Sequence, residues 1–252
     1  MVLAEYEETR LLTTDDCDHT GGWKMEKILS SMQNLAGSHA DSLGAGFRQL
    51  RPKNLAWVIS KTKIEMEKLP LFWHAVTLKT WTGKERHGIY PRYFSFHDEK
   101  GELLGGATVY WSLMDLAKRQ MATAEQTSSV VLPVSEKPPV CKPPKSVYLP
   151  DIPPKREIRQ VPVYSELDVN GHLNNTKYVA WFCDLLGPEF FEKQMISSLT
   201  IHYAKEILPK QEVTLRLYQT ETGYLFSGLV AEEVCFSAET VIRERKDASS
   251  LF

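Results

Sequence analysis

Hydrophobic residues recur at helical spacing in two separate stretches of the chain. The first stretch precedes Gly44 and has apolar residues three and four positions apart: Met25, Ile28, Leu29, Met32, Leu35, Ala36 and Leu43. The second precedes a Gly-Pro pair at Gly187 and has the same spacing: Tyr178, Trp181, Phe182, Leu185 and Leu186. This spacing is typical of a helix with one buried face, and a glycine just after it is a common stop signal. We therefore predict one long buried helix in each half of the chain.

Each predicted helix is followed by runs that are typical of β-strands. Residues 55–67 and 198–206 lead to a Leu-Pro pair, and residues 75–81 and 212–218 follow such a pair. Residues 90–115 add two alternating runs around an Asp-Glu-Lys-Gly turn, and the second half ends in the same way. Short turns favour antiparallel pairing, and a sheet with one apolar face must bury that face. The pattern predicts an α+β chain built from two copies of a long helix wrapped by an antiparallel sheet.

A proline-rich segment separates the two copies. Nine of the 14 prolines lie between Pro133 and Pro162, a stretch that contains no glycine. Proline removes a backbone donor and disrupts helices, so this segment is expected to be a stiff, extended connector. We predict an N-terminal unit at residues 1–130, a linker at 131–162 and a C-terminal unit at 163–252.

Composition narrows the possible functions. The 252 residues are 42% hydrophobic and 25% charged, with a net charge of −2, which gives no sign of nucleic-acid binding. No apolar run approaches the length of a transmembrane helix, and the acidic start lacks the features of a signal or transit peptide. The four cysteines are scattered, with neither metal-ligand spacing nor a disulfide pattern. We expect a cytoplasmic protein without a metal or another cofactor.

The candidate chemistry lies in the stretch DVNGHLNNTKY, just before the second predicted helix. Asp168, Asn170 and His172 occupy alternate positions there. Each alone fits a structural role, because Asn-Gly is a common turn pair and asparagine is a common helix N-cap. The stretch DHTG before the first helix aligns with DVNG, and it places Thr20 and Gly22 opposite the asparagine and the histidine. The amide and the imidazole are therefore not required by the turn, which favours a functional role.

A carboxylate completes this candidate group. Glu206 lies two residues before the Leu-Pro pair of the second half, as Glu67 does in the first. An exposed acid at a strand end is the structural alternative. Leu199, Ile201 and Tyr203 share the apolar positions of this strand, and Glu206 falls on the other parity. For its side chain to face the helix start, the strand must end or bulge near residues 204–205.

The segment LDVNGHLNNTKYVAWFCDLL closely resembles the D-x-N-x-H-x-N-N-x-x-Y segment of the acyl-acyl-carrier-protein (acyl-ACP) thioesterases. The first half resembles this family through MQNLAGSHADSLG, RYFSF and YWSLMDLAKRQ. The resemblance covers essentially the whole chain and implies a tandem (double) hotdog fold that hydrolyses fatty acyl thioesters on acyl carrier protein. The family's catalytic positions fall on Asp168, Asn170, His172 and Glu206. Some plant members have cysteine after the glutamate, but Ile207 stands here, so no thiol can act from that position.

With no serine or cysteine positioned as a nucleophile, we expect a mechanism by water attack, with the first turn of the second helix at Asn174 and Asn175 supplying backbone donors for the oxyanion. Glu206 is then the general base, or it orients a water that His172 deprotonates, and a covalent acyl-glutamate is also possible. Apolar residues of the first helix are expected to line the acyl pocket, with a purely structural core role as the alternative: Met32, Leu35, Ala36 and Leu43.

Acyl carrier protein is the expected partner, and because it is acidic it should meet a basic surface. Candidate cations in the linker region are Lys142, Lys145, Lys155, Arg156 and Arg159, although solvated linker charge is the simpler explanation. The alternatives to this function are an acyl-CoA thioesterase, a hotdog hydroxyacyl dehydratase and a non-catalytic acyl-binding protein. Two hotdog units in one chain are compatible with either a monomer or a homodimer.

Overall fold

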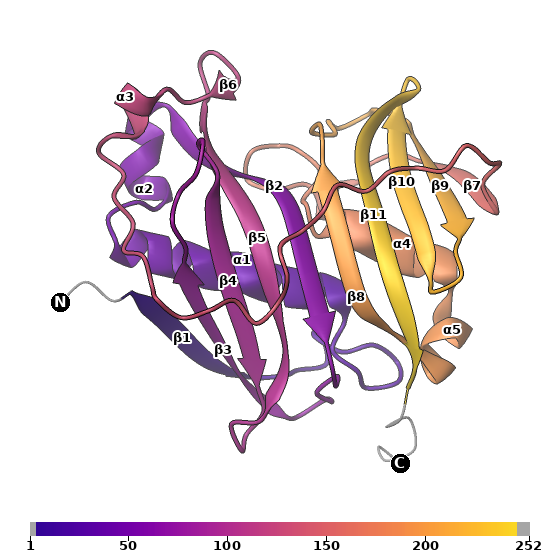
Figure 1. Cartoon of the computed structure of the whole chain (residues 1–252). Helices are drawn as coiled ribbons and strands as arrows, with labels where there is room; N and C mark the ends of the chain where they lie inside the picture. The colour runs from indigo at the N-terminus through magenta and orange to yellow at the C-terminus, as the bar shows by residue number, and fades with distance from the viewer. Residues whose placement is uncertain (1–3, 246–252) are drawn as a thin grey trace.

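The computed structural model describes residues 4–245, which form one large antiparallel sheet with helices on one side (Figure 1). The strands of the N-terminal half are β1 (Glu5–Leu11), β2 (Leu55–Met66), β3 (Ala75–Thr82), β4 (Tyr90–His97), β5 (Leu103–Asp115) and the short β6 (Gln120–Met121). Those of the C-terminal half are β7 (Arg156–Gln160), β8 (Gln194–Tyr203), β9 (Val213–Gln219), β10 (Tyr224–Val230) and β11 (Glu233–Glu244).

The strand order is the same from both edges of the sheet. It runs β1-β3-β4-β5-β2-β8-β11-β10-β9-β7, so each half contributes its own first, third, fourth, fifth and second strand, counted inward from the edge. The two halves join where β2 and β8 pair antiparallel, from Lys61 opposite His202 to Glu65 opposite Ser198. This arrangement confirms the predicted α+β class with two copies of one helix-and-sheet unit.

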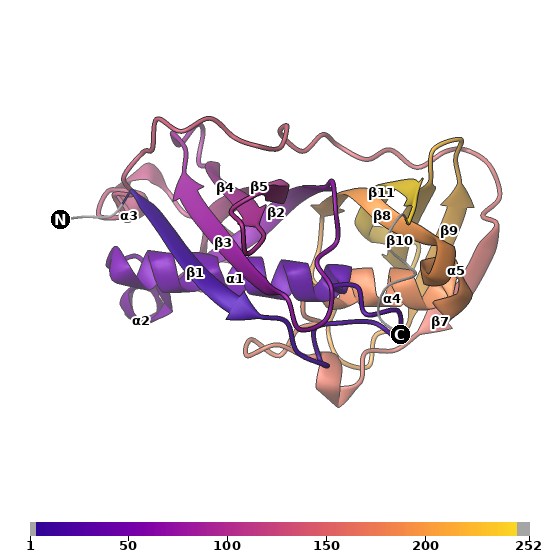
Figure 2. The same cartoon turned by 90° about the horizontal axis from the view of Figure 1, so that it is seen from below.

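The two predicted helices lie end to end along one face of the sheet (Figure 2). They are α1 (Met25–Ser42) and α4 (Lys177–Leu186). The shorter helices are α2 (Phe47–Leu50), α3 (Ala124–Thr127) and α5 (Pro188–Lys193), with 3-10 turns η1 (Arg51–Lys53) and η2 (Tyr164–Glu166). The apolar faces of α1 and α4 are buried in a single core cluster that contains side chains of both halves. Because each fully buried large side chain contributes about 1.5–3 kcal/mol, the shared core holds the halves together.

The segment after α3 crosses the opposite face of the sheet from the first half to the second (Figure 2). Side chains of the sheet donate hydrogen bonds to its carbonyl groups: Trp81 Nε1 to Lys137 O (3.0 Å), Thr108 Oγ1 to Cys141 O (2.7 Å) and Ser237 Oγ to Val147 O (3.3 Å). This part is extended, as its proline content predicts. Residues Arg156–Gln160 of the expected linker instead form the edge strand β7.

The two edge strands β1 and β7 were not predicted from the sequence. Both carry charged residues at most positions, as in EYEETRL, so they lack the alternation of a half-buried strand. Charged edge strands are common because they discourage pairing with other chains.

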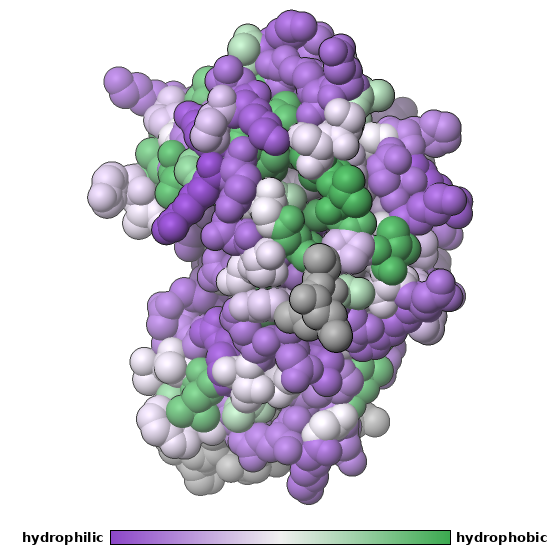
Figure 3. Space-filling view, turned by 90° about the vertical axis from the view of Figure 1, so that its left-hand side faces the viewer, coloured by the Kyte–Doolittle hydropathy of each residue, from purple (hydrophilic) through white to green (hydrophobic). Residues whose placement is uncertain are grey.

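Viewed from the β1 side, the surface is mainly hydrophilic with small hydrophobic groups (Figure 3). Within residues 4–245, no helix combines the length and the apolar character needed to cross a membrane.

Candidate active site

Asp168 organises the turn that carries the candidate asparagine and histidine. Its Oδ1 accepts hydrogen bonds from the backbone N–H groups of Asn170 (2.8 Å) and His172 (3.1 Å), and its Oδ2 accepts from Asn170 Nδ2 (3.3 Å). Gly171 has a φ of 79°, a conformation that glycine adopts without strain. Asp168 therefore fixes the backbone of the turn, and the bonds it accepts come from this turn and not from the imidazole.

The imidazole contacts the candidate carboxylate instead. His172 Nδ1 lies 3.2 Å from Glu206 Oε2, and the two side chains are 28% and 35% exposed. The contact leaves Nε2 as the ring nitrogen that can face a substrate or a water. The structure thus brings together Asp168, Asn170, His172 and Glu206 in one group.

The chain reaches this geometry because β8 ends early. The backbone N–H groups of Ala204 and Lys205 both donate to Cys235 O, at 2.8 and 2.9 Å, so the regular ladder stops after the last residue of β8. Farther along, Leu173 N donates to Ile207 O (2.9 Å) and ties the loop to the turn before α4. The sequence predicted that the strand must end or bulge near residues 204–205 if the glutamate is to face the helix start. The structure confirms this strand end.

Arg119 of the N-terminal half also contacts this group, although the sequence pattern did not predict it as a site residue. Its guanidinium forms an ion pair with Glu206 Oε1, so each carboxylate oxygen has its own partner. Arg119 lies in the turn after β5, has a φ of 52°, and follows Asp115, whose Oδ1 accepts backbone N–H bonds within that turn. No local signal could have revealed this contact, because the sheet pairing of the two halves creates it.

The first half contains the same turn without the candidate amide and imidazole at the matching positions. Asp18 Oδ1 accepts hydrogen bonds from the N–H groups of Thr20 (2.9 Å) and Gly22 (3.1 Å), matching the bonds to Asp168. The side chain of Arg245, only 4% exposed, donates to Thr20 Oγ1 and, at 3.2 Å, to Thr20 O. A Cβ atom on Gly22 would lie 2.8 Å from Arg245 Nη2. The guanidinium therefore occupies the space that an imidazole would need.

One detail of the internal alignment was wrong. The N–H groups of Glu67 and Lys68 donate to a single carbonyl, Leu104 O, just as the N–H groups of residues 204 and 205 share one. Counted from these N–H groups, the counterpart of Glu206 is Leu69 and not Glu67. The segment from these groups to the Leu-Pro pair is two residues shorter in the first half than in the second. The first half therefore lacks the carboxylate as well as the amide and the imidazole.

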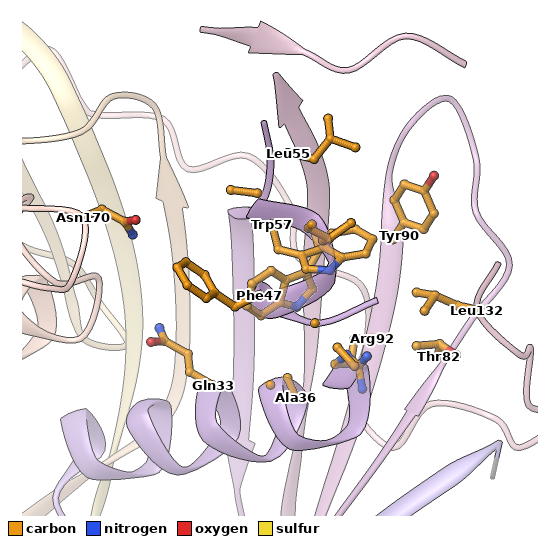
Figure 4. Close-up of a pocket in the computed structure, with 16 residues that line it drawn as sticks. Gln33, Ala36, Phe47, Leu55, Trp57, Thr82, Tyr90, Arg92, Leu132 and Asn170 are labelled. Carbon is orange, nitrogen blue, oxygen red and sulfur yellow. The ribbon is translucent and has the colours of Figure 1, made fainter. Parts of the chain in front are cut away.

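A cavity of about 180 Å³ opens beside this group, within the N-terminal half (Figure 4). Asn170 and Gln33 lie on one side of it, and Arg92 and Thr82 lie on the other. The wall between them includes aromatic and aliphatic side chains from α2 and the sheet: Phe47, Leu50, Leu55, Trp57, Tyr90 and Trp111. Burial lowers the pKa of the Arg92 guanidinium to about 10. The cavity is thus largely apolar between two polar ends.

The predicted pocket residues of α1 divide between this cavity and the core. Ala36 lines the cavity. Met32 and Leu35 belong to the buried core cluster, at 2% and 1% exposure, and Leu43 is the half-buried C-cap of α1. The cavity stripe is Gln33, Ala36, Gly37 and Ala40. Since each helical residue turns the side chain by about 100°, this stripe lies beside the apolar face that the sequence pattern identified.

The start of α4 differs from the expectation. The helix begins at Lys177, and Asn174 caps the turn before it through two bonds. Asn174 Oδ1 accepts from Thr176 N (3.0 Å), and Asn174 O accepts from Lys177 N (2.8 Å). Two of the backbone donors near the predicted helix start are thereby already bonded, and they are not free to stabilise an oxyanion. Asn175, also predicted as a substrate contact, is half-buried in the same turn.

Cys183 of α4 is not activated as a nucleophile. Burial, followed by the nearby Asp184, raises the pKa of the Cys183 thiol, which makes it a poor nucleophile at neutral pH. Ile207, which follows the glutamate, is fully buried. Among residues 4–245, no cluster of three His, Cys, Asp or Glu side chains is placed to hold a metal ion.

Comparisons with known proteins agree with the residue pattern. Residues 4–128 match the acyl-ACP thioesterase N-terminal domain, and residues 154–244 match the acyl-ACP thioesterase C-terminal domain. The acyl-[acyl-carrier-protein] hydrolase FATB3, chloroplastic, of Cuphea viscosissima is 27% identical over 72% of this chain and 47% of its own length. The chain thus spans about half the length of the curated relatives it matches.

Two solved structures share the fold over nearly the whole chain. The acyl-ACP thioesterase from Bacteroides thetaiotaomicron superposes with a TM-score of 0.87 at 22% identity, covering 95% of this chain and 98% of the other. The 12:0-ACP thioesterase from Umbellularia californica has a TM-score of 0.87 at 22% identity, covering 97% and 99%. Together with the two matched domains, the double helix-and-sheet architecture shows that the chain belongs to the acyl-ACP thioesterase family.

Proposed function

We propose that this protein hydrolyses fatty acyl thioesters carried on acyl carrier protein, releasing a free fatty acid and the carrier thiol. One observation supports this most strongly. Asn170 of the C-terminal half lies at the end of a largely apolar cavity in the N-terminal half, and the same turn carries His172, which contacts Glu206. A thioester hydrolase needs this combination, since the acyl chain must be buried while its carbonyl carbon remains within reach of an activated water.

In this mechanism His172 is the general base. Glu206 directs one oxygen at His172 Nδ1 and the other at Arg119, so the carboxylate is better placed to orient the imidazole than to take a proton from water. The carboxylate holds the ring with Nδ1–H toward itself, and Nε2 accepts a proton from the attacking water. The same argument disfavours a covalent acyl-glutamate.

The remaining groups position the reaction. The water oxygen attacks the carbonyl carbon, the C–S bond breaks, and the imidazolium returns its proton to the departing thiolate. Asp168 keeps Asn170 and His172 in place through their backbone N–H groups. Asn170 lies at the cavity end, where its side chain can hold the water or the thioester.

The two halves then have different tasks. The C-terminal half supplies the chemistry, and the N-terminal half supplies the acyl cavity together with Arg119. The cationic Arg92 at the far side of the cavity would limit the length of chain that enters, because an alkyl end is poorly accommodated beside a guanidinium.

The carrier and the compartment are also part of this proposal. The curated relatives carry acyl-ACP hydrolase in their names, which favours acyl carrier protein over coenzyme A as the carrier. We place the protein in a reducing compartment, the cytoplasm, because its four cysteines are free thiols. The internal pairing of β2 with β8 satisfies the usual pairing of hotdog units within a monomer.

Thiol release from acyl carrier proteins bearing C8 to C18 chains tests the proposal. We expect release that peaks at one chain length and falls by at least about 100-fold in His172→Ala. Acyl-CoA of the same chain length serves as the matched carrier control. No thiol release from any acyl carrier protein by folded protein would refute the proposal, and faster release from acyl-CoA would reassign the carrier.

A further inference from the structure

Gln33 carries a buried polar group that the proposed mechanism does not use. Its amide nitrogen, Nε2, is inaccessible to solvent and has no hydrogen-bond partner within residues 4–245. A buried donor without a partner destabilises the protein, because it has lost its hydrogen bonds to water. Such a group in an active-site wall is readily explained if a ligand supplies the missing acceptor.

The position of Gln33 indicates which atom of a ligand would accept its hydrogen bond. The α1 stripe along the cavity is otherwise formed by Ala36, Gly37 and Ala40, which have no side-chain polar groups. Gln33 lies at the end of this stripe nearest to Asn170 (Figure 4). An acyl chain lying along the small residues would bring its thioester carbonyl to the glutamine.

Thioester hydrolysis also requires a hydrogen-bond donor at the carbonyl oxygen. The carbonyl oxygen becomes an oxyanion during water attack, and it needs preorganised hydrogen-bond donors. The N–H groups of Thr176 and Lys177, near the start of α4, are already bonded to Asn174. An amide on the facing helix α1 can serve in their place.

The second half offers an internal comparison. Cys183 stands at the same distance in sequence from Asp168 as Gln33 does from Asp18, and it lines a second cavity beside the Asp18 turn. That turn has Gly22 at the position of His172, and its own His19 corresponds to Val169. Its facing helix has no amide at this position. The amide donor therefore faces only the turn that carries the candidate base.

From these four observations we propose that the Gln33 side chain turns its amide toward a bound thioester, so that Nε2 donates a hydrogen bond to the carbonyl oxygen and stabilises the oxyanion during hydrolysis. This inference rests on the proposed thioesterase function and adds a catalytic residue from the N-terminal half. The thioester is then held between groups of both halves: the glutamine on one side, and the histidine with its glutamate on the other.

Gln33→Met tests the proposal because methionine keeps the length of the side chain and removes the donor. We expect kcat to fall about 100- to 1000-fold, the range for loss of one oxyanion donor, with KM within about threefold. The reduction should be the same for short and long acyl chains. The melting temperature should stay the same or rise, because an unpaired buried amide is removed. Gln33→Glu should also lose activity, since a carboxylate offers no donor at neutral pH.

Cys183→Met is the matched control at the corresponding helix position, and its kcat should stay within about threefold of wild type. Wild-type-like kcat in Gln33→Met would overturn the inference while leaving the thioesterase function intact. A loss of kcat that changes with chain length, or that accompanies a lower melting temperature, would also overturn it in favour of a packing role. If wild type itself releases no thiol, the proposed function fails and this inference fails with it.

Discussion

The contact between His172 and Glu206 makes a quantitative prediction about how the two residues share the catalytic work. In the structure Glu206 Oε2 lies 3.2 Å from His172 Nδ1, and Oε1 is held by Arg119. If the glutamate acts only by orienting the imidazole, it has nothing to act on once the imidazole is removed. The informative variants are Glu206→Gln, His172→Ala and the double substitution.

The expected magnitudes follow from this arrangement. Loss of a general base typically costs about 10²- to 10⁴-fold in rate, or about 2.7–5.4 kcal/mol. We expect each single variant to fall in this range and the double variant to be no slower than His172→Ala alone. The coupling free energy would then equal the whole effect of Glu206→Gln. Both side chains are about one-third exposed, so their contact should contribute no more than about 1 kcal/mol to folding stability.

Single-turnover thiol release with one acyl carrier protein substrate measures all four proteins under the same conditions. Melting temperatures serve as the control for folding and should agree within a few degrees. A double variant whose loss equals the product of the two single losses would contradict the reasoning. In that case Glu206 would act independently of the imidazole, as a separate base or as a nucleophile.

Other substitutions probe how the site is built. Arg119→Met should lower kcat only about two- to fivefold, because its ion pair with Glu206 is partly exposed. The difference from wild type should be smaller in high salt, which screens such a pair. A loss above 100-fold would mean that the arginine contacts the substrate. Asp168→Ala and Asp18→Ala should each destabilise the fold by about 1–3 kcal/mol in chemical denaturation, because each leaves turn N–H groups unbonded. Only Asp168→Ala should abolish thiol release. Equal activity in these two variants would contradict the assignment of the chemistry to one half. Ala36→Phe should move the preferred acyl chain to a shorter length in a C8 to C18 series, since Ala36 lines the cavity, and an unchanged profile would place the acyl chain elsewhere.

Features that depend on neighbours in sequence were predictable. The spacing of apolar residues identified α1 and α4, because a helix repeats every 3.6 residues whatever it packs against. The turn at residues 168–172 was also recognisable, since Asp168 bonds to N–H groups only two and four residues away. The repetition of this turn at Asp18 revealed the two-copy architecture.

Features that depend on contacts between distant segments required the tertiary structure. The ion pair between Arg119 and Glu206 exists because β2 pairs with β8, and nothing near either residue in sequence indicates it. The burial of Arg245 over Gly22 has the same origin. The sequence by itself determined which half carries the imidazole and the amide, because side-chain identity is local. Only the tertiary structure decided that their cavity, and the cation beside the glutamate, belong to the other half, because strand pairing brings these segments together.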